Sequence, residues 1–145
     1  MFEFDYCKQF GEFWQAQHKY ELLLPGSDIP NWFNHQSGGN YISFWIDRCF
    51  PKFVCCVVFG RRPYELFWNL TLRVTLKLNG ILLMDGIPIG IKRVEDVTYK
   101  HRWFFNVFDF PGLEDLNLFD RNRVEFKFEE SYQGVSNILW CGVHA

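Results

Sequence analysis

Hydrophobic and polar residues alternate with a period of two in several short stretches of the chain. The longest runs from Leu70 to Leu78, where Leu or Val occupies every second position and Thr, Arg or Lys the positions between. Tyr41–Ile46 and Val124–Glu129 alternate in the same way. Because successive side chains of a strand point to opposite faces, this pattern predicts strands with one buried and one solvated face.

Other stretches predict strands and turns by different signals. Phe53–Phe59 is apolar throughout, which predicts a strand covered on both faces. Arg102–Phe110 and Asn137–Val143 complete the set of predicted strands. Asn79-Gly80 predicts a tight hairpin turn, because both residues tolerate positive φ. Further turns are predicted at Gly38-Gly39, Gly60, Asp85-Gly86, Pro111-Gly112 and Gly134.

Many short strands separated by Gly and Pro turns predict an all-β fold, an antiparallel sandwich of two sheets with a jelly-roll or Ig-like arrangement. The N-terminus is different, because Phe2, Tyr6, Phe10 and Phe13 approach a helical period that Gly11 interrupts. We therefore divide the 145 residues into an N-terminal joint, residues 1–18, and a sandwich domain, residues 19–145. For the joint, a short helix and an irregular segment are both open.

Composition narrows the classes of function. The chain has 15 Lys and Arg residues against 17 Asp and Glu residues and no basic run, which argues against binding to nucleic acid or to a membrane surface. The longest apolar run, Phe53–Phe59, is far shorter than the roughly 18 residues that span a bilayer. The five cysteines have no repeated spacing, which predicts reduced, buried thiols and a reducing compartment.

One stretch, LPGSDIPNWFNHQSGGN at residues 24–40, contains the only compact set of residues that could act as a hydrolase: Ser27, Asp28 and His35. Ser27 does not lie in a G-x-S-x-G elbow, and short polar residues after Pro-Gly are common in turns. Cys141 and His144 are the only close Cys and His pair, with no second pair for zinc. We therefore predict neither catalysis nor a metal or cofactor site.

The alternative interpretation of residues 24–40 is structural. Pro25 and Gly26 predict a turn, and Ile29, Trp32 and Phe33 are predicted to be apolar plugs that close one end of the sandwich. A lectin-like function also stays open, because Tyr41, Trp45, Trp68 and Trp103 could stack on sugars if they are exposed.

Several stretches together resemble a known family. The segments LPGSDIPNWFNHQSGGNYISFWI, FVCCVVF, LTLRVTLKLNG, VEFKFEE and the closing LWCGVHA are similar to the C-terminal jelly-roll/Ig-like domain of plant TIR-type nucleotide-binding leucine-rich-repeat immune receptors, also called the post-LRR domain. The similarity runs from about Tyr20 to His144. Its most specific parts are Leu24–Gly38 and Cys141–His144.

The resemblance implies a non-catalytic recognition module that follows the leucine-rich repeats and contacts a pathogen effector protein with them. It implies a cytoplasmic location, with the nucleus as the alternative. Gly60–Asn69 is the predicted contact loop, because Arg61, Arg62, Tyr64 and Trp68 are residue types that anchor interfaces. Two other functions stay open: the lectin-like module, and a purely architectural cap on the repeat solenoid.

Overall fold

The structure is a computed structural model that describes residues 21–48, 52–60, 68–94, 100–107, 118–130 and 137–145. In this part of the chain, all regular structure is β and no helix occurs. The predicted N-terminal helix and the turns at Pro111-Gly112 and Gly134 lie outside the described residues. The strands are β1 (Glu21–Pro25), β2 (His35–Gly38), β3 (Tyr41–Ile46), β4 (Phe53–Phe59), β5 (Trp68–Leu78), β6 (Ile81–Val94), β7 (His101–Val107), β8 (Asn122–Glu130) and β9 (Ile138–His144).

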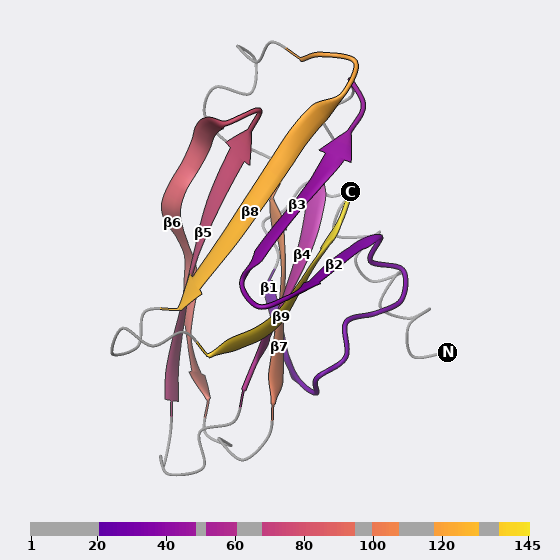
Figure 1. The fold of residues 1–145 in the computed structure, drawn as a ribbon. Helices are drawn as coiled ribbons and strands as arrows, with labels where there is room; N and C mark the ends of the chain where they lie inside the picture. The colour runs from indigo at the N-terminus through magenta and orange to yellow at the C-terminus, as the bar shows by residue number, and fades with distance from the viewer. Residues whose placement is uncertain (1–20, 49–51, 61–67, 95–99, 108–117, 131–136) are drawn as a thin grey trace.

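The strands form two antiparallel sheets that pack face to face (Figure 1). One sheet has five strands in the order β1-β7-β4-β9-β2, and the other has four in the order β3-β8-β5-β6. The first crossing of the chain from one sheet to the other, between β2 and β3, lies at Gly39. Its φ of 80° suits glycine, as the Gly38-Gly39 signal predicts. The predicted all-β sandwich is confirmed.

Phenylalanine rings from the two sheets meet in the core. Phe53 of β4 contacts Phe126 of β8 edge to face, with 5.1 Å between the ring centroids. Phe105 of β7 contacts Phe128 of β8 in the same way at 5.9 Å. All four rings are buried. Burial of side chains this large contributes most of the hydrophobic stabilisation of a β domain.

The predicted hairpin after the alternating strand is confirmed. Asn79 and Gly80 have φ values of 51° and 81°, and Leu78 pairs directly with Ile81 across the turn. Two consecutive residues with positive φ match the twist of the flanking strands. Asn79 also receives a hydrogen bond on its side-chain oxygen from the backbone N–H of Arg123, which ties the hairpin to β8.

The turn predicted at Asp85-Gly86 is wrong, because both residues lie inside the long strand β6. Gly86 has a φ of 57°, its N–H donates to the Thr75 hydroxyl, and its carbonyl accepts from Arg73. The register of β6 against β5 shifts at several places along the strand. Bulges of this kind, and Pro88, are tolerated because β6 is an edge strand that pairs on one side alone.

Candidate functional site

Residues 29–33 cover the outer face of the five-stranded sheet. Phe33 is 2% exposed and packs with Val54, Cys56 and Phe104, which point away from the sandwich core. Ile29 and Trp32 pack on the same cluster. We expected these apolar residues to close one end of the sandwich, whereas the structure places them on a face of one sheet. They cover Val54 and Cys56, two of the outward residues of β4, a strand in which every residue is buried.

Arg102 of β7 holds the start of this covering segment. Its guanidinium donates to the carbonyl of Asp28 at 3.0 Å and to that of Pro25 at 3.1 Å. The same guanidinium lies 5.7 Å from the ring centroid of Phe104. A Cβ on Gly26 would lie 2.9 Å from Arg102 Nε, and the φ of Gly26 is +127°. Glycine is therefore required at this position by both conformation and contact.

The hydrogen-bonded turn of the segment lies later than expected. Gly26 donates its N–H to the carbonyl of Lys100 and so extends the pairing of β1 with β7. The turn is closed instead by the Phe33 N–H, which donates to the Pro30 carbonyl at 3.0 Å. This turn brings Trp32 and Phe33 back onto the sheet, where their ring centroids are 4.4 Å apart.

The structure separates the three residues that could have formed a hydrolase site. Ser27 and Asp28 are exposed in the segment after β1. His35 lies in β2 with its ring stacked on Phe44 at 3.9 Å. Burial lowers the pKa of His35, and the nearby His144 lowers it further. No hydrogen bond joins Ser27, Asp28 and His35, all of which belong to the described part of the chain.

Three cysteines, Cys55, Cys56 and Cys141, are free and buried, while Cys7 and Cys49 lie outside the described residues. Burial raises the pKa of all three thiols, to about 12 for Cys141, so they stay protonated at neutral pH. Cys141 belongs to the sandwich core, whereas the ring of His144 packs on Trp32 outside it. Among the residues that the structure describes, no group of His, Cys, Asp and Glu could hold a metal ion.

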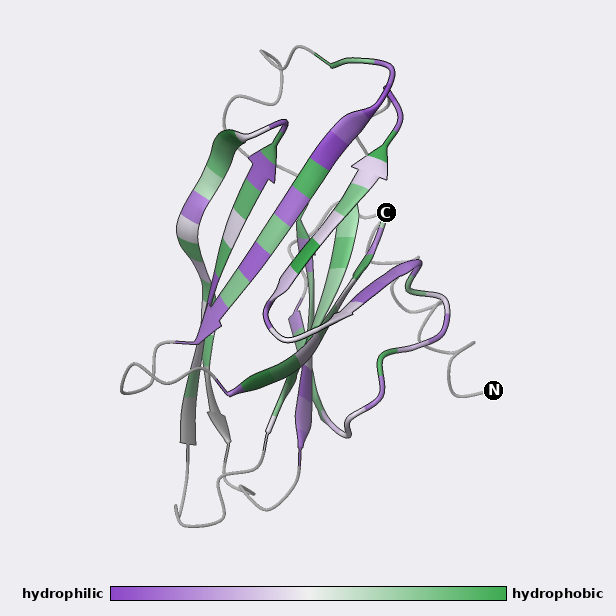
Figure 2. Cartoon of the chain, viewed as in Figure 1, coloured by the Kyte–Doolittle hydropathy of each residue, from purple (hydrophilic) through white to green (hydrophobic). Residues whose placement is uncertain are grey.

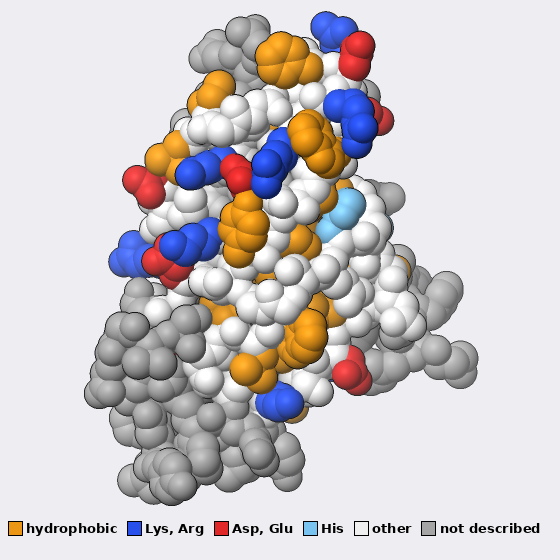
Figure 3. Space-filling view, in the orientation of Figure 1, with side chains coloured by type: hydrophobic (Ala, Val, Ile, Leu, Met, Phe, Trp, Pro, Cys, Tyr) orange, Lys and Arg blue, Asp and Glu red, His pale blue; other side chains and the backbone are white. Residues whose placement is uncertain are grey.

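The outer face of the four-stranded sheet is open to solvent and differs in character. In Figure 3, basic and acidic side chains alternate across it, with apolar side chains among them. Trp45 of β3 is 54% exposed, and the Arg121 guanidinium lies 5.2 Å from its ring centroid. Tyr41, on the same strand, is 43% exposed, and its hydroxyl donates to Glu125 of β8 at 2.6 Å.

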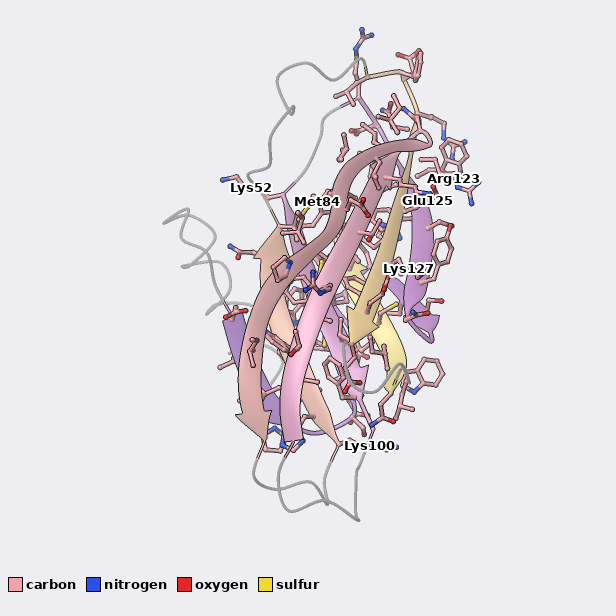
Figure 4. All side chains as sticks on the ribbon, turned by 90° about the vertical axis from the view of Figure 1, so that its left-hand side faces the viewer. Lys52, Met84, Lys100, Arg123, Glu125 and Lys127 are labelled. Atoms are coloured by element: carbon pink, nitrogen blue, oxygen red, sulfur yellow. The ribbon has the colours of Figure 1, made fainter. Side chains whose placement is uncertain are left out.

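A hollow of about 350 Å³ lies on the same face. Its lining comes from all four strands of the sheet: Tyr41 from β3, Glu125, Lys127 and Glu129 from β8, Thr75 and Lys77 from β5, and Leu82 and Asp85 from β6. Figure 4 views the sandwich from the β6 side, with Arg123, Glu125 and Lys127 along β8. A hollow of this size is at the small end of the range for ligand pockets.

The predicted contact loop is only partly within the described residues. Arg61, Arg62 and Tyr64 lie outside them, and Trp68 is the first residue of β5. Trp103, which we considered as an exposed aromatic, is fully buried in the core. Sequence reasoning singled out Tyr41 and Trp45 but missed Arg121, whose position over Trp45 depends on the approach of a loop to β3. It also missed Trp140, 52% exposed on β9.

Comparison with known proteins settles the family. The family model of the C-JID domain matches residues 24–145. The chain belongs to the C-JID family. The C-JID domain is the C-terminal, post-LRR domain of TIR-NLR receptors, which confirms the resemblance seen in the sequence. A search of the curated proteins found no match. Among the described residues, no helix has the length and apolar character needed to cross a membrane.

Proposed function

We propose that this C-JID domain is a non-catalytic recognition module that, together with the leucine-rich repeats of its receptor, contacts a pathogen effector protein inside the plant cell. The observation that carries the proposal is the exposed Trp45 on the open face of the four-stranded sheet, stacked with Arg121. Trp and Arg are the residue types most enriched at the energetic centres of protein interfaces. We call Trp45, Arg121 and Arg123 the Trp45 surface.

The strands beneath the Trp45 surface give it a rigid base. Trp45 pairs with Arg123 in the β3–β8 ladder, and the core side of β3 carries buried Ile42 and Phe44. An aromatic side chain on a fixed strand loses little conformational entropy when it binds, so more of its burial contributes to affinity. The loop that contains Arg61, Arg62 and Tyr64 stays a second candidate contact.

A second role is supported by a separate observation on β6. Ile81, Ile87 and Ile91 are all exposed on this one edge strand, and Ile91 is 71% exposed. The carboxylate of Glu21, where the described chain enters the sandwich at β1, lies against Gly90 of β6. We propose that the preceding repeats cover this aliphatic edge, which would join the sandwich to the solenoid.

The recognition role is tested with the full receptor in plant leaves, co-expressed with a panel of effector proteins. We expect Trp45→Ala with Arg121→Ala to abolish cell death triggered by an effector that the unaltered receptor recognises, at unchanged receptor abundance. Arg62→Glu tests the loop in the same assay, and Trp140→Ala, an exposed aromatic on β9 of the other sheet, is the control. A full response from the Trp45 and Arg121 double variant would remove the Trp45 surface from the contact. A full response after deletion of residues 21–145 would remove the recognition role altogether.

For the β6 edge, the measurement is limited proteolysis of the repeats joined to the domain. We expect Ile87→Ser with Ile91→Ser to loosen this junction, seen as faster protease cleavage between the repeats and Glu21. An unchanged cleavage rate would contradict the packing role and leave effector recognition unaffected.

A further inference from the structure

The hollow on the four-stranded sheet has a lining with a definite chemical character. Two ammonium groups, from Lys77 and Lys127, stand among three carboxylates, from Asp85, Glu125 and Glu129. Apolar contact comes from Tyr41 and Leu82. The lining therefore offers hydrogen-bond donors and acceptors side by side without a large excess of either charge.

Much of this lining is already organised. The Tyr41 hydroxyl is held by Glu125 at 2.6 Å, which fixes the ring at the rim and leaves it 43% exposed. The Lys127 Nζ lies 3.6 Å from the Oε1 of Glu129. The side chains of Lys77 and Asp85, in contrast, have no hydrogen bond or ion pair with any residue that the structure describes. One donor and one acceptor are thus available on the neighbouring strands β5 and β6.

The register of the strands places these groups around one small residue. Lys127 pairs with Tyr41 on one side of β8 and with Thr75 on the other. Lys77 pairs with Leu82 across the β5–β6 ladder. Because Thr75 is much shorter than its neighbours and uses its hydroxyl to accept from Gly86, the floor of the hollow stays low between long side chains.

These features select the ligand by its chemistry. Three carboxylates disfavour an anion, and two ammonium groups disfavour a cation, because each would face like charge at close range. A purely apolar ligand would leave Lys77 and Asp85 without the water that solvates them. A neutral ligand with many hydroxyl groups satisfies both, since each hydroxyl donates and accepts. The apolar face of a pyranose ring can in addition pack on Tyr41.

We propose that this hollow binds a neutral saccharide, with a pyranose ring packed on Tyr41 and its hydroxyl groups bonded to Lys77 and Asp85. The lining includes neither Trp45 nor Arg121, so the inference does not depend on the proposed function. The hollow is open at the surface, so its lining contacts the saccharide alone. A free sugar and a sugar attached to a partner protein therefore both fit.

The test is an NMR titration of the ¹⁵N-labelled 145-residue chain with three tetrasaccharides that differ in charge: neutral cellotetraose, cationic tetraglucosamine and anionic tetragalacturonate. We expect cellotetraose to shift the amide resonances of Tyr41, Thr75 and Lys77 with a dissociation constant of about 1 mM or lower, and the charged sugars to bind at least about tenfold more weakly. No shift at about 10 mM cellotetraose, or preference for a charged sugar, would overturn the proposal.

Variants separate the hollow from other aromatic surfaces. We expect Tyr41→Ala to abolish cellotetraose binding, Tyr41→Phe to retain most of it, and Lys77→Met or Asp85→Asn to weaken it by about tenfold. Trp140→Ala removes a similarly exposed aromatic from the other sheet and is the matched control. Equal loss with Trp140→Ala, or full binding with Tyr41→Ala, would contradict the assignment.

A final arm distinguishes the source of the sugar. A serine-containing peptide that carries one N-acetylglucosamine is titrated beside the same peptide without the sugar. Binding of the glycopeptide more tightly than cellotetraose assigns the hollow to protein-linked sugar, and the reverse order assigns it to free saccharide. Equal binding of the unmodified peptide would show that the hollow takes polypeptide and would overturn the proposal.

Discussion

The two sheets of this C-JID domain share a core, but their outer faces differ in exposure to solvent. In the five-stranded sheet, β4 is buried along its whole length, and Phe33 and its neighbours cover Val54 and Cys56 on its outer side. In the four-stranded sheet, β8 alternates between buried and solvated positions along its length. Figure 2 shows the contrast as an almost continuous apolar β4 beside a striped β8.

This contrast indicates which outer face can carry side chains for binding. The outer side chains of Val54, Cys56 and Phe104 must fit the covering segment that Arg102 holds, so they serve stability. A side chain on the outer face of the four-stranded sheet meets water, so Trp45, Tyr41 and the charged residues around them can change without disturbing the core. Both proposals for binding therefore fall on the open sheet.

The largest difference in stability is expected when the same charge is placed on each outer face. Cys56→Lys puts an ammonium under the covering segment, beside Arg102, where desolvation and like charge should cost about 3 to 5 kcal/mol of a total stability of about 5 to 15 kcal/mol. Ser43→Lys, from a residue of similar size on β3, should change the free energy of unfolding by about 0.5 kcal/mol or less. Urea unfolding of both variants is the measurement, and equal losses would mean that the two faces do not differ.

Removal of the cover should come next in size. Phe33→Ala leaves a cavity over Val54 and Phe104, which we expect to cost about 3 to 4 kcal/mol. Ser27→Ala, in the exposed part of the same segment, should lie within about 0.5 kcal/mol of the unaltered chain. Thermal unfolding monitored by circular dichroism compares the two. A loss at Ser27 as large as that at Phe33 would place the stability of the segment in its polar residues instead.

The attachment of the cover is probed at Gly26. An alanine there must adopt a positive φ, which costs about 1 to 2 kcal/mol. Its Cβ also displaces the Arg102 guanidinium from its two carbonyl partners. Gly39 has a similar demand, with a φ of +80°, but a Cβ added there would have no atom within 4 Å. We therefore expect Gly26→Ala to cost at least about 1 kcal/mol more than Gly39→Ala in urea unfolding. Equal costs would show that the Arg102 contact is not a constraint.

The smallest expected effect concerns pH at the corner between the sheets. Burial and His144 lower the pKa of His35 in the folded chain, so the unfolded chain binds more protons below its ordinary pKa of about 6.5. Above that pH the ring of His35 is neutral in both the folded and the unfolded chain, so it does not make stability depend on pH. As the pH drops below that value, the unfolded chain takes up the proton more readily and stability falls. His35→Phe keeps a ring on Phe44 and should reduce the fall in Tm between about pH 7 and pH 5.5. An identical fall in both proteins would assign the pH dependence to other groups.

Much of the sandwich could be predicted from local pattern. Alternation along Leu70–Leu78 and Tyr41–Ile46, the apolar run Phe53–Phe59 and the Asn79-Gly80 turn all correspond to what the structure contains. These signals work because each strand records its own two faces in its own residues. By the same logic, Tyr41 and Trp45 could be recognised as candidates, since they occupy the solvent side of an alternating strand.

Features that depend on contacts between distant segments could not be predicted. Asp85-Gly86 predicts a turn, yet β6 continues through it because its edge position and the Thr75 and Arg73 contacts tolerate bulges. The strands β1 and β2 have no clear alternation and form because β7 and β9 offer them partners. Register across four strands likewise decides that Tyr41, Lys77 and Asp85 surround one hollow.

Period-two patterning and the motif at Leu24–Gly38 are properties of the chain read in order, so they predict the family, the fold class and the buried face of each alternating strand without a structure. That Ile29, Trp32 and Phe33 cover a sheet face rather than close an end depends on how distant segments pack. That choice rests on Arg102, which is far along the chain and yet holds the carbonyls of Pro25 and Asp28. Hydrophobic residues favour burial without specifying the surface that buries them; directional hydrogen bonds between distant residues select that surface.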